Sequence, residues 1–305
     1  PHVGNPEIQY PNYVYTTSLS AGLSEHFKNF AENILERLAP TPGSLVVEMG
    51  SNDGTLLRFF KEAGMRVQGI DPAREIARRA TEQGIDTLGT FFGRTIAEEI
   101  RAEKGPASIM IANNVIANID DLSDIADGVR TVLADDGVFV FETQYGADVV
   151  EKNLLDTVYH EHLSYFNIKP LELYFARHGM EVFHIQRIWT KGGSIRVFVQ
   201  HSGGPRSVGK IVLEMIQMEE EAGHYGREIY DVWNDRILNI RSALNEIVLA
   251  ERAASRSVAG YGVSVGTTTL LPQFEVTNKI DVLFDDDPNK DPVLTGPGYS
   301  IPVRQ

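Results

Sequence analysis

Residues 46–54 have the sequence VVEMGSNDG, and this stretch decides the fold. Its apolar start predicts a buried strand, the glycines predict a tight turn, and a helix is expected from about Thr55. Amphipathic helical patterns separate further short apolar runs along the first half of the chain. The predicted strands of this series are Leu45–Val47, Val67–Ile70, Ile109–Ala112 and Val138–Phe141. Such an alternation is typical of a parallel sheet covered by helices on both faces.

The end of this sheet is expected to differ from its beginning. Two strand-like runs, Met180–Trp189 and Ser194–His201, are joined only by Thr190–Gly193, which is too short for a crossover helix. They are therefore predicted to be antiparallel neighbours. The predicted fold class is α/β: a Rossmann-like sheet with an antiparallel last strand, as in class I methyltransferases, plus a second, partial Rossmann-like α/β domain.

Composition narrows the class of protein. The chain has 305 residues, of which 42% are hydrophobic, so it can bury a sizeable core. The absence of cysteine excludes disulfides and thiolate metal sites within these residues. The formal charge of −14 argues against nucleic acid or an anionic membrane as a partner, because both attract clustered Lys and Arg. With no apolar run long enough to cross a bilayer, we expect a soluble, cytoplasmic enzyme for a small molecule.

Four segments are expected along the chain. Residues 1–40 form an N-terminal arm with a lid helix, because Ser18–Leu38 has apolar residues at helical spacing. Residues 41–205 form the domain that holds the Rossmann-like sheet, and 206–255 form a connector of one or two helices. Residues 256–305 contain the strand Ser257–Tyr261, a turn at Gly262–Gly266, a helix and the strand Lys279–Phe284. This last domain is too short for a complete Rossmann unit, and the start at Pro1 without a leader suggests a processed or partial chain.

The turn after the first strand predicts a nucleoside-binding site. Its pattern, Glu48-x-Gly50-x-x-x-Gly54, replaces the G-x-G-x-x-G of dinucleotide-binding folds and leaves an acidic group where a pyrophosphate would lie. Gly50 lets the backbone approach a ligand, and amides at the helix start can face its polar groups. Asp71 ends the next strand, where it can accept both hydroxyls of an adenosine ribose. These features favour S-adenosylmethionine over NAD.

Other candidate contacts lie at the same edge of the sheet. Asn113 and Asn114 end a strand there and suit either the methionine part of the cofactor or a simple turn. Phe91 and Phe92 suit either an adenine ring or the core. The predicted cofactor-binding residues are Glu48, Gly50, Ser51, Asn52, Asp53, Gly54, Asp71, Pro72, Phe91, Asn113 and Asn114.

Residues 157–166, TVYHEHLSYF, gather two imidazoles, a carboxylate and two phenols in a short span. His160 and His162 lack the His-Glu-x-x-His spacing that puts two ligands on one helix face, so a metal site is disfavoured. Two interpretations remain: a set of structural hydrogen bonds, or acid–base chemistry, which we favour.

Five motifs in the same order resemble the sugar C-methyltransferases of deoxysugar biosynthesis. They are Glu48-x-Gly50-Ser51-Asn52-Asp53-Gly54, Tyr159-x-Glu161-His162, Gly192-Gly193-Ser194-x-Arg196, Gly260-Tyr261-Gly262 and Thr295-x-Pro297-Gly298-x-x-Ile301-Pro302. The similarity runs from about Ser18 to the end of the chain. That family has a small zinc-binding domain, a methyltransferase core and a Rossmann-like C-terminal domain, with a nucleotide sugar between the last two.

The resemblance implies that Tyr159, Glu161 and His162 lie at the reacting carbon. His162, or Tyr159 in a coupled pair, would remove a proton next to a ketone, and the enolate would attack the methyl group. Glu161 would orient the imidazole or anchor a sugar hydroxyl, and no metal is required. The residues implied to bind substrate are Asn118, Lys191, Gly193, Ser194, Arg196, Tyr261, Ser264 and Thr267.

The chain departs from this family pattern in three places. It has no cysteine-rich zinc-binding domain, and Asn118 stands where family members commonly have a histidine. The turn Gly262–Thr268 lacks a lysine that usually lies there, so a diphosphate would depend on backbone amides and hydroxyls.

Three alternatives stay open beside methyl transfer to the carbon of a keto sugar. An O- or N-methyltransferase would use the same His162 toward a hydroxyl or amine of another small metabolite. A ligand-binding module without turnover would keep the cofactor turn and have no use for Tyr159–His162. A dehydrogenase using Gly260–Gly266 for NAD is disfavoured, because no acidic residue follows at the expected place.

Overall fold

The computed structural model describes residues 4–11, 17, 22–288 and 290–305. The chain divides into two compact units, Pro1–Tyr145 with Leu163–Met218, and Gly146–His162 with Glu219–Gln305. The segment Gly146–His162 therefore leaves the first unit between two of its strands and belongs to the second unit. Each unit is described by itself below.

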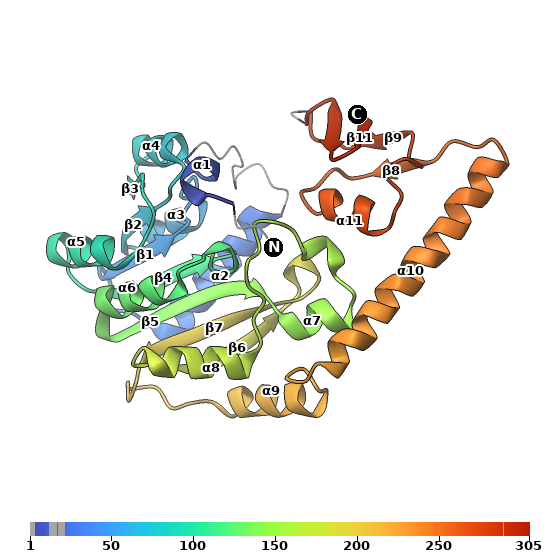
Figure 1. The fold of residues 1–305 in the computed structure, drawn as a ribbon. Helices are drawn as coiled ribbons and strands as arrows, with labels where there is room; N and C mark the ends of the chain where they lie inside the picture. The colour runs from blue at the N-terminus through green and yellow to red at the C-terminus, as the bar shows by residue number, and fades with distance from the viewer. Residues whose placement is uncertain (1–3, 12–16, 18–21, 289) are drawn as a thin grey trace. The chain divides into compact units, whose positions relative to one another are not determined.

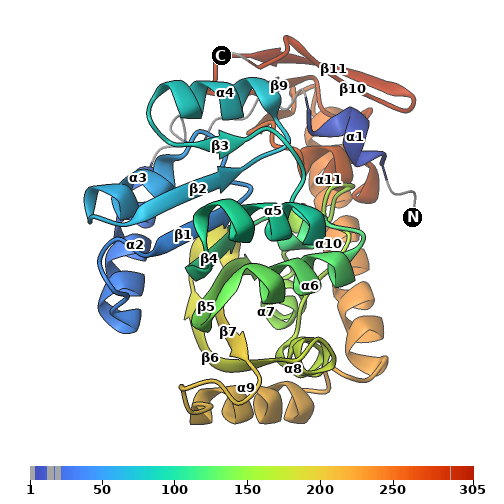
Figure 2. The ribbon, with the colours of Figure 1, turned by 90° about the vertical axis from the view of Figure 1, so that its left-hand side faces the viewer.

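The first unit is built on a seven-stranded sheet with the order β3-β2-β1-β4-β5-β7-β6 (Figures 1 and 2). Its strands are β1 (Leu45–Met49), β2 (Arg66–Ile70), β3 (Thr87–Leu88), β4 (Ala107–Asn113), β5 (Leu133–Gln144), β6 (Met180–Ile188) and β7 (Ser194–His201). β1 pairs in parallel with β2 and β4, whereas β7 pairs antiparallel with β5 and β6. The predicted α/β class and the predicted antiparallel pair are confirmed.

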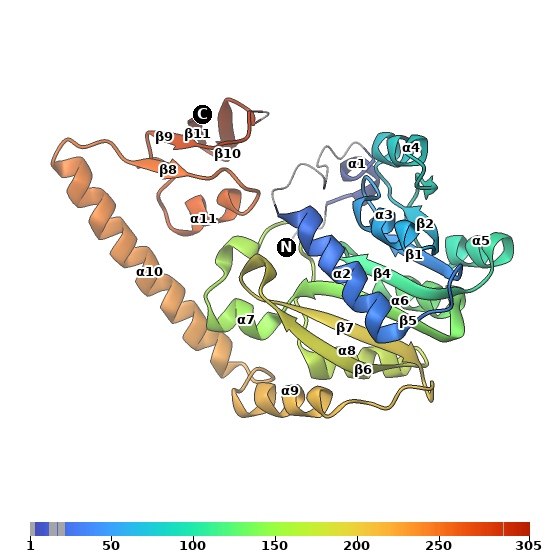
Figure 3. The ribbon, with the colours of Figure 1, turned by 180° about the vertical axis from the view of Figure 1, so that it is seen from behind.

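Helices cover both faces of this sheet. The helices of the first unit are α1 (Pro6–Gln9), α2 (Leu23–Leu38), α3 (Thr55–Glu62), α4 (Arg74–Glu82), α5 (Arg94–Lys104), α6 (Leu122–Val132) and α8 (Ile168–Arg177), with the short helices η2 (Ile116–Asn118) and η4 (Thr190–Gly192) in connections. On one face, Phe30 of α2 packs in a core cluster with Val46 and Ile111, and Figure 3 shows α2 lying across β5 and β7. On the other face, Phe175 of α8 packs against Phe141. The first residues of the helix predicted at Ser18–Leu38, 18–21, lie outside the described residues.

A buried ion pair fastens α2 to the sheet. Glu142 of β5 is 1% exposed, and its Oε1 accepts hydrogen bonds from Nε and Nη2 of Arg196 on β7, at 2.8 and 2.6 Å. Its Oε2 lies 2.9 Å from Nε2 of His26 on α2. The Arg196 guanidinium also lies over the ring of Phe30, 4.3 Å from its centroid. Both carboxylate oxygens thus have partners, which offset the cost of burying the charge.

Arg196→Met is expected to lower the free energy of unfolding by about 3–5 kcal/mol, because it leaves the buried Glu142 carboxylate without its guanidinium. Urea unfolding of the variant and the wild-type protein measures this difference. Arg78→Met is the matched control, since Arg78 pairs with Glu75 and Glu82 on an exposed helix surface and should change stability little. Equal effects of the two substitutions would contradict a structural role for the buried pair.

The second unit holds a four-stranded sheet with the order β10-β11-β9-β8. Its elements are α7 (Gly146–Glu151), η3 (Leu155–Thr157), α10 (Glu228–Ala253), β8 (Ala259–Tyr261), α11 (Thr267–Gln273), β9 (Val282–Phe284), β10 (Val293–Gly296) and β11 (Tyr299–Arg304), and α9 (Lys210–Glu221) crosses the boundary between the units. β8 and β9 are parallel and are joined through α11, whose Leu271 packs in a small core with Leu283 and Ile301. No helix within the described residues has the length and apolar character that a membrane span needs.

Candidate functional site

Hydrogen bonds of its own backbone close the turn after β1. Four amides have partners inside the protein: Gly50 and Ser51 donate to the Ile70 carbonyl, Asn52 to the Asp71 carboxylate, and Gly54 to the Ser51 carbonyl. Gly50 has a φ of 69°, and a Cβ there would overlap Cγ2 of Val115. Val115 thus lies beside Gly50, and these four amides serve the turn itself. That the Gly50 backbone and the amides at the start of α3 meet a ligand stays a prediction.

Side chains at the same edge of the sheet hold buried polar atoms without a hydrogen-bond partner in the protein. They are Glu48 Oε2, Ser51 Oγ, both amide atoms of Asn113, and Asn114 Oδ1. Glu48 and Asn113 lie toward the carboxyl ends of the adjacent parallel strands β1 and β4, which is where open α/β sheets bind ligands. Because buried polar groups in folded proteins almost always have partners, these atoms mark a place for a polar ligand.

Two backbone amides hold Asp71 at the end of β2. Its Oδ2 accepts from Asn52 N and its Oδ1 from Ala73 N, each at 2.9 Å, and the residue is 7% exposed. Each carboxylate oxygen keeps a second lone pair. The carboxylate is therefore fixed in orientation and can still accept two hydroxyls.

Burial raises the pKa of Glu48 well above its ordinary range, and the nearby Asp71 and Asp53 carboxylates raise it further. Burial also raises the pKa of Asp71, against the lowering effect of its two amide hydrogen bonds. This edge of the sheet therefore gathers acidic groups that a bound cation would help to ionise.

The two phenylalanines that follow β3 have different environments. Phe92 is 7% exposed in the core, whereas Phe91 is 39% exposed and meets Tyr10 edge to face, with ring centroids 6.5 Å apart. Phe91 is therefore the ring of the pair that remains available to a ligand.

In the second unit, Tyr159 and His162 form a hydrogen-bonded pair. His162 is 8% exposed, and its Nδ1 donates to the carbonyl oxygen of Thr157 at 2.7 Å. A carbonyl oxygen only accepts, so the neutral imidazole carries its proton on Nδ1 and a lone pair on Nε2. Nε2 accepts the hydroxyl proton of Tyr159 at 2.9 Å.

The Thr157 carbonyl therefore orients this imidazole, which was one of the two roles that the family resemblance implied for Glu161. The Glu161 carboxylate lies 4.0 Å from the ring of the exposed His160, and its role as a hydroxyl anchor stays a prediction. In the part of the chain that the structure describes, no group of three His, Cys, Asp or Glu side chains is arranged to hold a metal ion.

The glycine turn between β8 and α11 is held by hydrogen bonds to residues outside the turn. Val263 N donates to Asp285 Oδ2 at 2.6 Å, and Lys290 Nζ donates to the Val263 carbonyl at 2.8 Å. A lysine thus reaches this turn from position 290, outside the sequence of the turn itself. The expectation that no acidic residue follows is wrong, because Asp285 comes directly after β9. Asp285 uses its other oxygen to accept the amide of Asp287, so its carboxylate ties the turn together.

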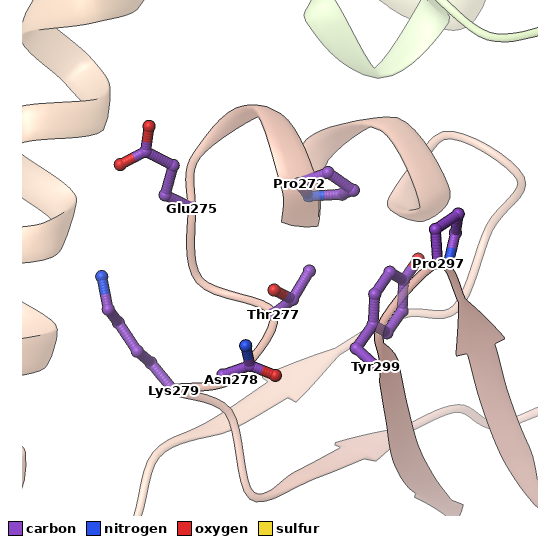
Figure 4. Close-up of a pocket in the computed structure, with 7 residues that line it drawn as sticks. All are labelled: Pro272, Glu275, Thr277, Asn278, Lys279, Pro297 and Tyr299. Carbon is purple, nitrogen blue, oxygen red and sulfur yellow. The ribbon is translucent and has the colours of Figure 1, made fainter.

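A separate pocket of about 390 Å³ opens in the second unit between the end of α11 and the β10–β11 turn (Figure 4). It is lined by Pro272, Glu275, Thr277, Asn278, Lys279, Pro297 and Tyr299. Its charged groups are paired, since Glu275 accepts from Arg241 at 3.0 Å and Lys279 donates to Asn245. None of the predicted catalytic or cofactor-binding residues lines it, so it is not the candidate site.

The geometry agrees with what comparison with known proteins finds. Residues 23–185, more than half of the chain, match the family model of the methyltransferase domain. The chain belongs to the methyltransferase family. Residues 189–305 of the methyltransferase match the C-methyltransferase C-terminal domain.

One curated relative covers both parts of the methyltransferase. The chain is 34% identical over 270 residues to the C-methyltransferase NovU of Streptomyces niveus. These aligned residues cover 88% of this chain and 64% of NovU. The chain thus spans less than two thirds of that relative's length.

Two solved structures are similar to part of the chain. The PH0226 protein of Pyrococcus horikoshii OT3 matches with a TM-score of 0.50 at 13% identity, over 61% of this chain and 94% of that one. The magnesium protoporphyrin IX methyltransferase of Synechocystis PCC 6803, solved with bound SAH, matches with a TM-score of 0.42 at 15% identity. The match covers 58% of this chain and 82% of that one. With the family match and the strand order, the fold is that of class I S-adenosylmethionine-dependent methyltransferases.

In the methyltransferase, four of the predicted substrate residues lie on the β6–β7 hairpin: Lys191, Gly193, Ser194 and Arg196. Ser194 is fully buried and donates its hydroxyl to the Thr190 carbonyl, and Arg196 is the buried partner of Glu142. The polar groups of Ser194 and Arg196 thus hold the hairpin and α2, and their contact with substrate stays a prediction. Lys191, at the exposed tip of the hairpin, stays a prediction.

The remaining predicted substrate residues fall into two groups. Asn118 of η2 has a buried Oδ1 without a partner and stays a candidate. Tyr261 is 75% exposed and donates its hydroxyl to Asp286, while Ser264 and Thr267 place their hydroxyl oxygens 3.5 Å apart in the glycine turn.

Three contacts in these sites could not be predicted from the sequence. They are the packing of Val115 beside Gly50, the hydrogen bond from His162 to the Thr157 carbonyl, and the hydrogen bond from Lys290 to the glycine turn. A backbone carbonyl leaves no signal in the residue type. Val115 and Lys290 belong to segments far along the chain from their partners, so no local pattern could have indicated them.

Proposed function

We propose that this chain is an S-adenosylmethionine-dependent methyltransferase that transfers a methyl group to a carbon of a nucleotide-linked keto sugar. The Tyr159–His162 pair, with its tautomer fixed by Thr157, is the observation that carries the proposal. Transfer to carbon needs a base, because the carbon must first lose a proton. The match of residues 189–305 to a C-methyltransferase domain and the similarity to NovU support carbon as the acceptor.

The unpartnered atoms of the first unit fit the methyl donor. When bound, S-adenosylmethionine supplies an electrophilic methyl group on a sulfonium. Glu48 Oε2 and Asn114 Oδ1 offer acceptors for its ammonium group, and Nδ2 of the Asn113 side chain offers a donor for its carboxylate. Asp71 offers two acceptors for the ribose hydroxyls, and Phe91 offers an exposed ring face for the adenine.

The proton would move along the hydrogen-bonded pair. The carbon–hydrogen bond next to the ketone breaks, its proton passes to the Tyr159 oxygen, and the hydroxyl proton of Tyr159 passes to His162 Nε2. The imidazolium that forms keeps its Nδ1–H on the Thr157 carbonyl, which therefore stabilises the charged state. The electron pair left on the substrate becomes the enolate that accepts the methyl group.

Deuterium exchange tests this proposal directly. The protein is incubated in D₂O with nucleotide-linked keto sugars and without a methyl donor, and the carbon next to the ketone is followed by NMR. We expect deuterium to enter at that carbon, and a new carbon-bound methyl group to form once S-adenosylmethionine is added. A methyl group found on oxygen or nitrogen, with no exchange at carbon, would replace this function by the O- or N-methyltransferase alternative.

Binding of S-adenosylmethionine is expected to release a proton and to tighten as pH rises through the raised pKa of Glu48. Because burial raises the pKa of Glu48, the free site keeps a proton to a higher pH, and a bound cation lowers that pKa. Calorimetry in two buffers of different ionisation enthalpy counts the released proton. Glu48→Gln should remove both the release and the pH dependence, and proton release that persists in this variant would assign it to another group.

A further inference from the structure

Gly266, at the start of α11, is packed against the segment that carries the acid–base pair. A Cβ added to Gly266 would overlap the carbonyl oxygen of Asp156 and would lie 3.0 Å from its carbonyl carbon and 3.2 Å from its Cα. These are backbone atoms, which cannot rotate away as a flexible side chain would. The φ of Gly266 is −59°, a value open to every residue, so this contact alone requires glycine.

The contact lies one residue from the group that orients His162. Asp156 and Thr157 belong to the same short helix, η3, and the Thr157 carbonyl holds Nδ1 of His162 at 2.7 Å. His162 in turn accepts the hydroxyl of Tyr159. Any shift of η3 away from α11 would therefore move the carbonyl on which the imidazole depends.

The other end of the segment is fastened to α10 of the same unit. Arg236 Nη2 donates to the Val150 carbonyl at 2.9 Å, at the end of α7. The buried His224 contributes a second contact, with its Nε2 3.3 Å from the Glu151 carboxylate. Within the second unit, residues 146–162 are thus held both at α7 and at η3.

We propose that Gly266 is a positioning residue for the Tyr159–His162 pair, acting through the Asp156 backbone and the Thr157 carbonyl. Its function as a glycine is to let α11 close onto η3. The effect on catalysis rests on the proposed function, whereas the effect on the imidazole does not.

Gly266→Ala tests the proposal, with Val265→Ala as the matched control, because Val265 lies in the same turn with a 42% exposed side chain. The first readout needs no substrate: in protein labelled with ¹⁵N-histidine, the wild-type His162 is expected as the Nδ1–H tautomer, assigned by its absence in His162→Asn. Gly266→Ala should mix the tautomers or shift this signal, and Val265→Ala should leave it unchanged. An unchanged His162 signal in Gly266→Ala would overturn the proposal, whatever the enzyme's substrate is.

The second readout is deuterium exchange into a keto sugar. We expect Gly266→Ala to slow exchange about 100-fold, the cost of a displacement of about 1 Å. Its half-maximal rate should move to higher pH, because a tyrosine without its imidazole loses a proton only near its ordinary pKa of about 10. The affinity of Gly266→Ala for S-adenosylhomocysteine should stay as in the wild type. A loss of affinity as large as the loss of exchange rate would show general damage to the fold and overturn the proposal.

A second variant covers the case in which Gly266→Ala does not fold. Arg236→Met releases the α7 end of the segment without touching the turn, and it should change the His162 signal in the same direction. An unchanged signal there would also count against the proposal. A wild-type protein that shows the expected tautomer but exchanges no keto sugar would reject the proposed function and leave the positioning role intact.

Discussion

Tyr159→Phe is expected to lower the rate of methyl transfer by about 10²- to 10⁴-fold, the usual contribution of a positioned acid–base group. Phenylalanine keeps the ring and removes the hydroxyl that donates to His162 Nε2 at 2.9 Å. Deuterium exchange at the carbon should fall by the same factor, because both reactions need the same proton transfer. Single-turnover methyl transfer and exchange in D₂O measure the two rates.

His162→Gln is the companion variant, and the double variant decides how the pair acts. If Tyr159 and His162 work as one unit, the double variant should be about as slow as either single variant. Additive losses would assign them separate roles. Exchange that survives in Tyr159→Phe and disappears in His162→Gln would make the imidazole itself the base, and the relay through tyrosine would be wrong.

Asp71→Ala is expected to weaken S-adenosylhomocysteine binding by at least about 100-fold. The carboxylate would lose two hydrogen bonds to the ribose, each worth about 1.5–3 kcal/mol when one partner is charged. The amides of Asn52 and Ala73, which this carboxylate now accepts, would also lose their partner. Isothermal titration calorimetry measures the change directly.

Asp86→Ala is the control for that experiment. Its carboxylate lies in the same unit but is 57% exposed and pairs with Lys104, so its loss should leave cofactor affinity unchanged. Deuterium exchange into the keto sugar should persist in Asp71→Ala, since the acid–base pair belongs to the other unit. Loss of exchange together with loss of affinity would show that proton transfer depends on the cofactor site.

Much of the cofactor region was predictable from residue order, because it depends on short-range features. A buried strand, a turn with left-handed glycines and an acidic residue at the next strand end follow each other within 26 residues, from Val46 to Asp71. The antiparallel β6–β7 pair followed from a connection too short for a crossover. The ion pair of Arg196 could not be predicted in this way, because its partner Glu142 lies on another strand, far back along the chain.

The amino-acid sequence is enough to determine the strand–turn–helix unit and its acidic residues, because these depend on periodicity and turn residues that lie close together along the chain. The folded chain alone establishes which buried polar atoms lack a partner, which nitrogen of His162 carries the proton, and why position 266 has no side chain. Each of these depends on backbone groups or on segments far apart in the chain, and such groups meet only when the sheets and helices have packed.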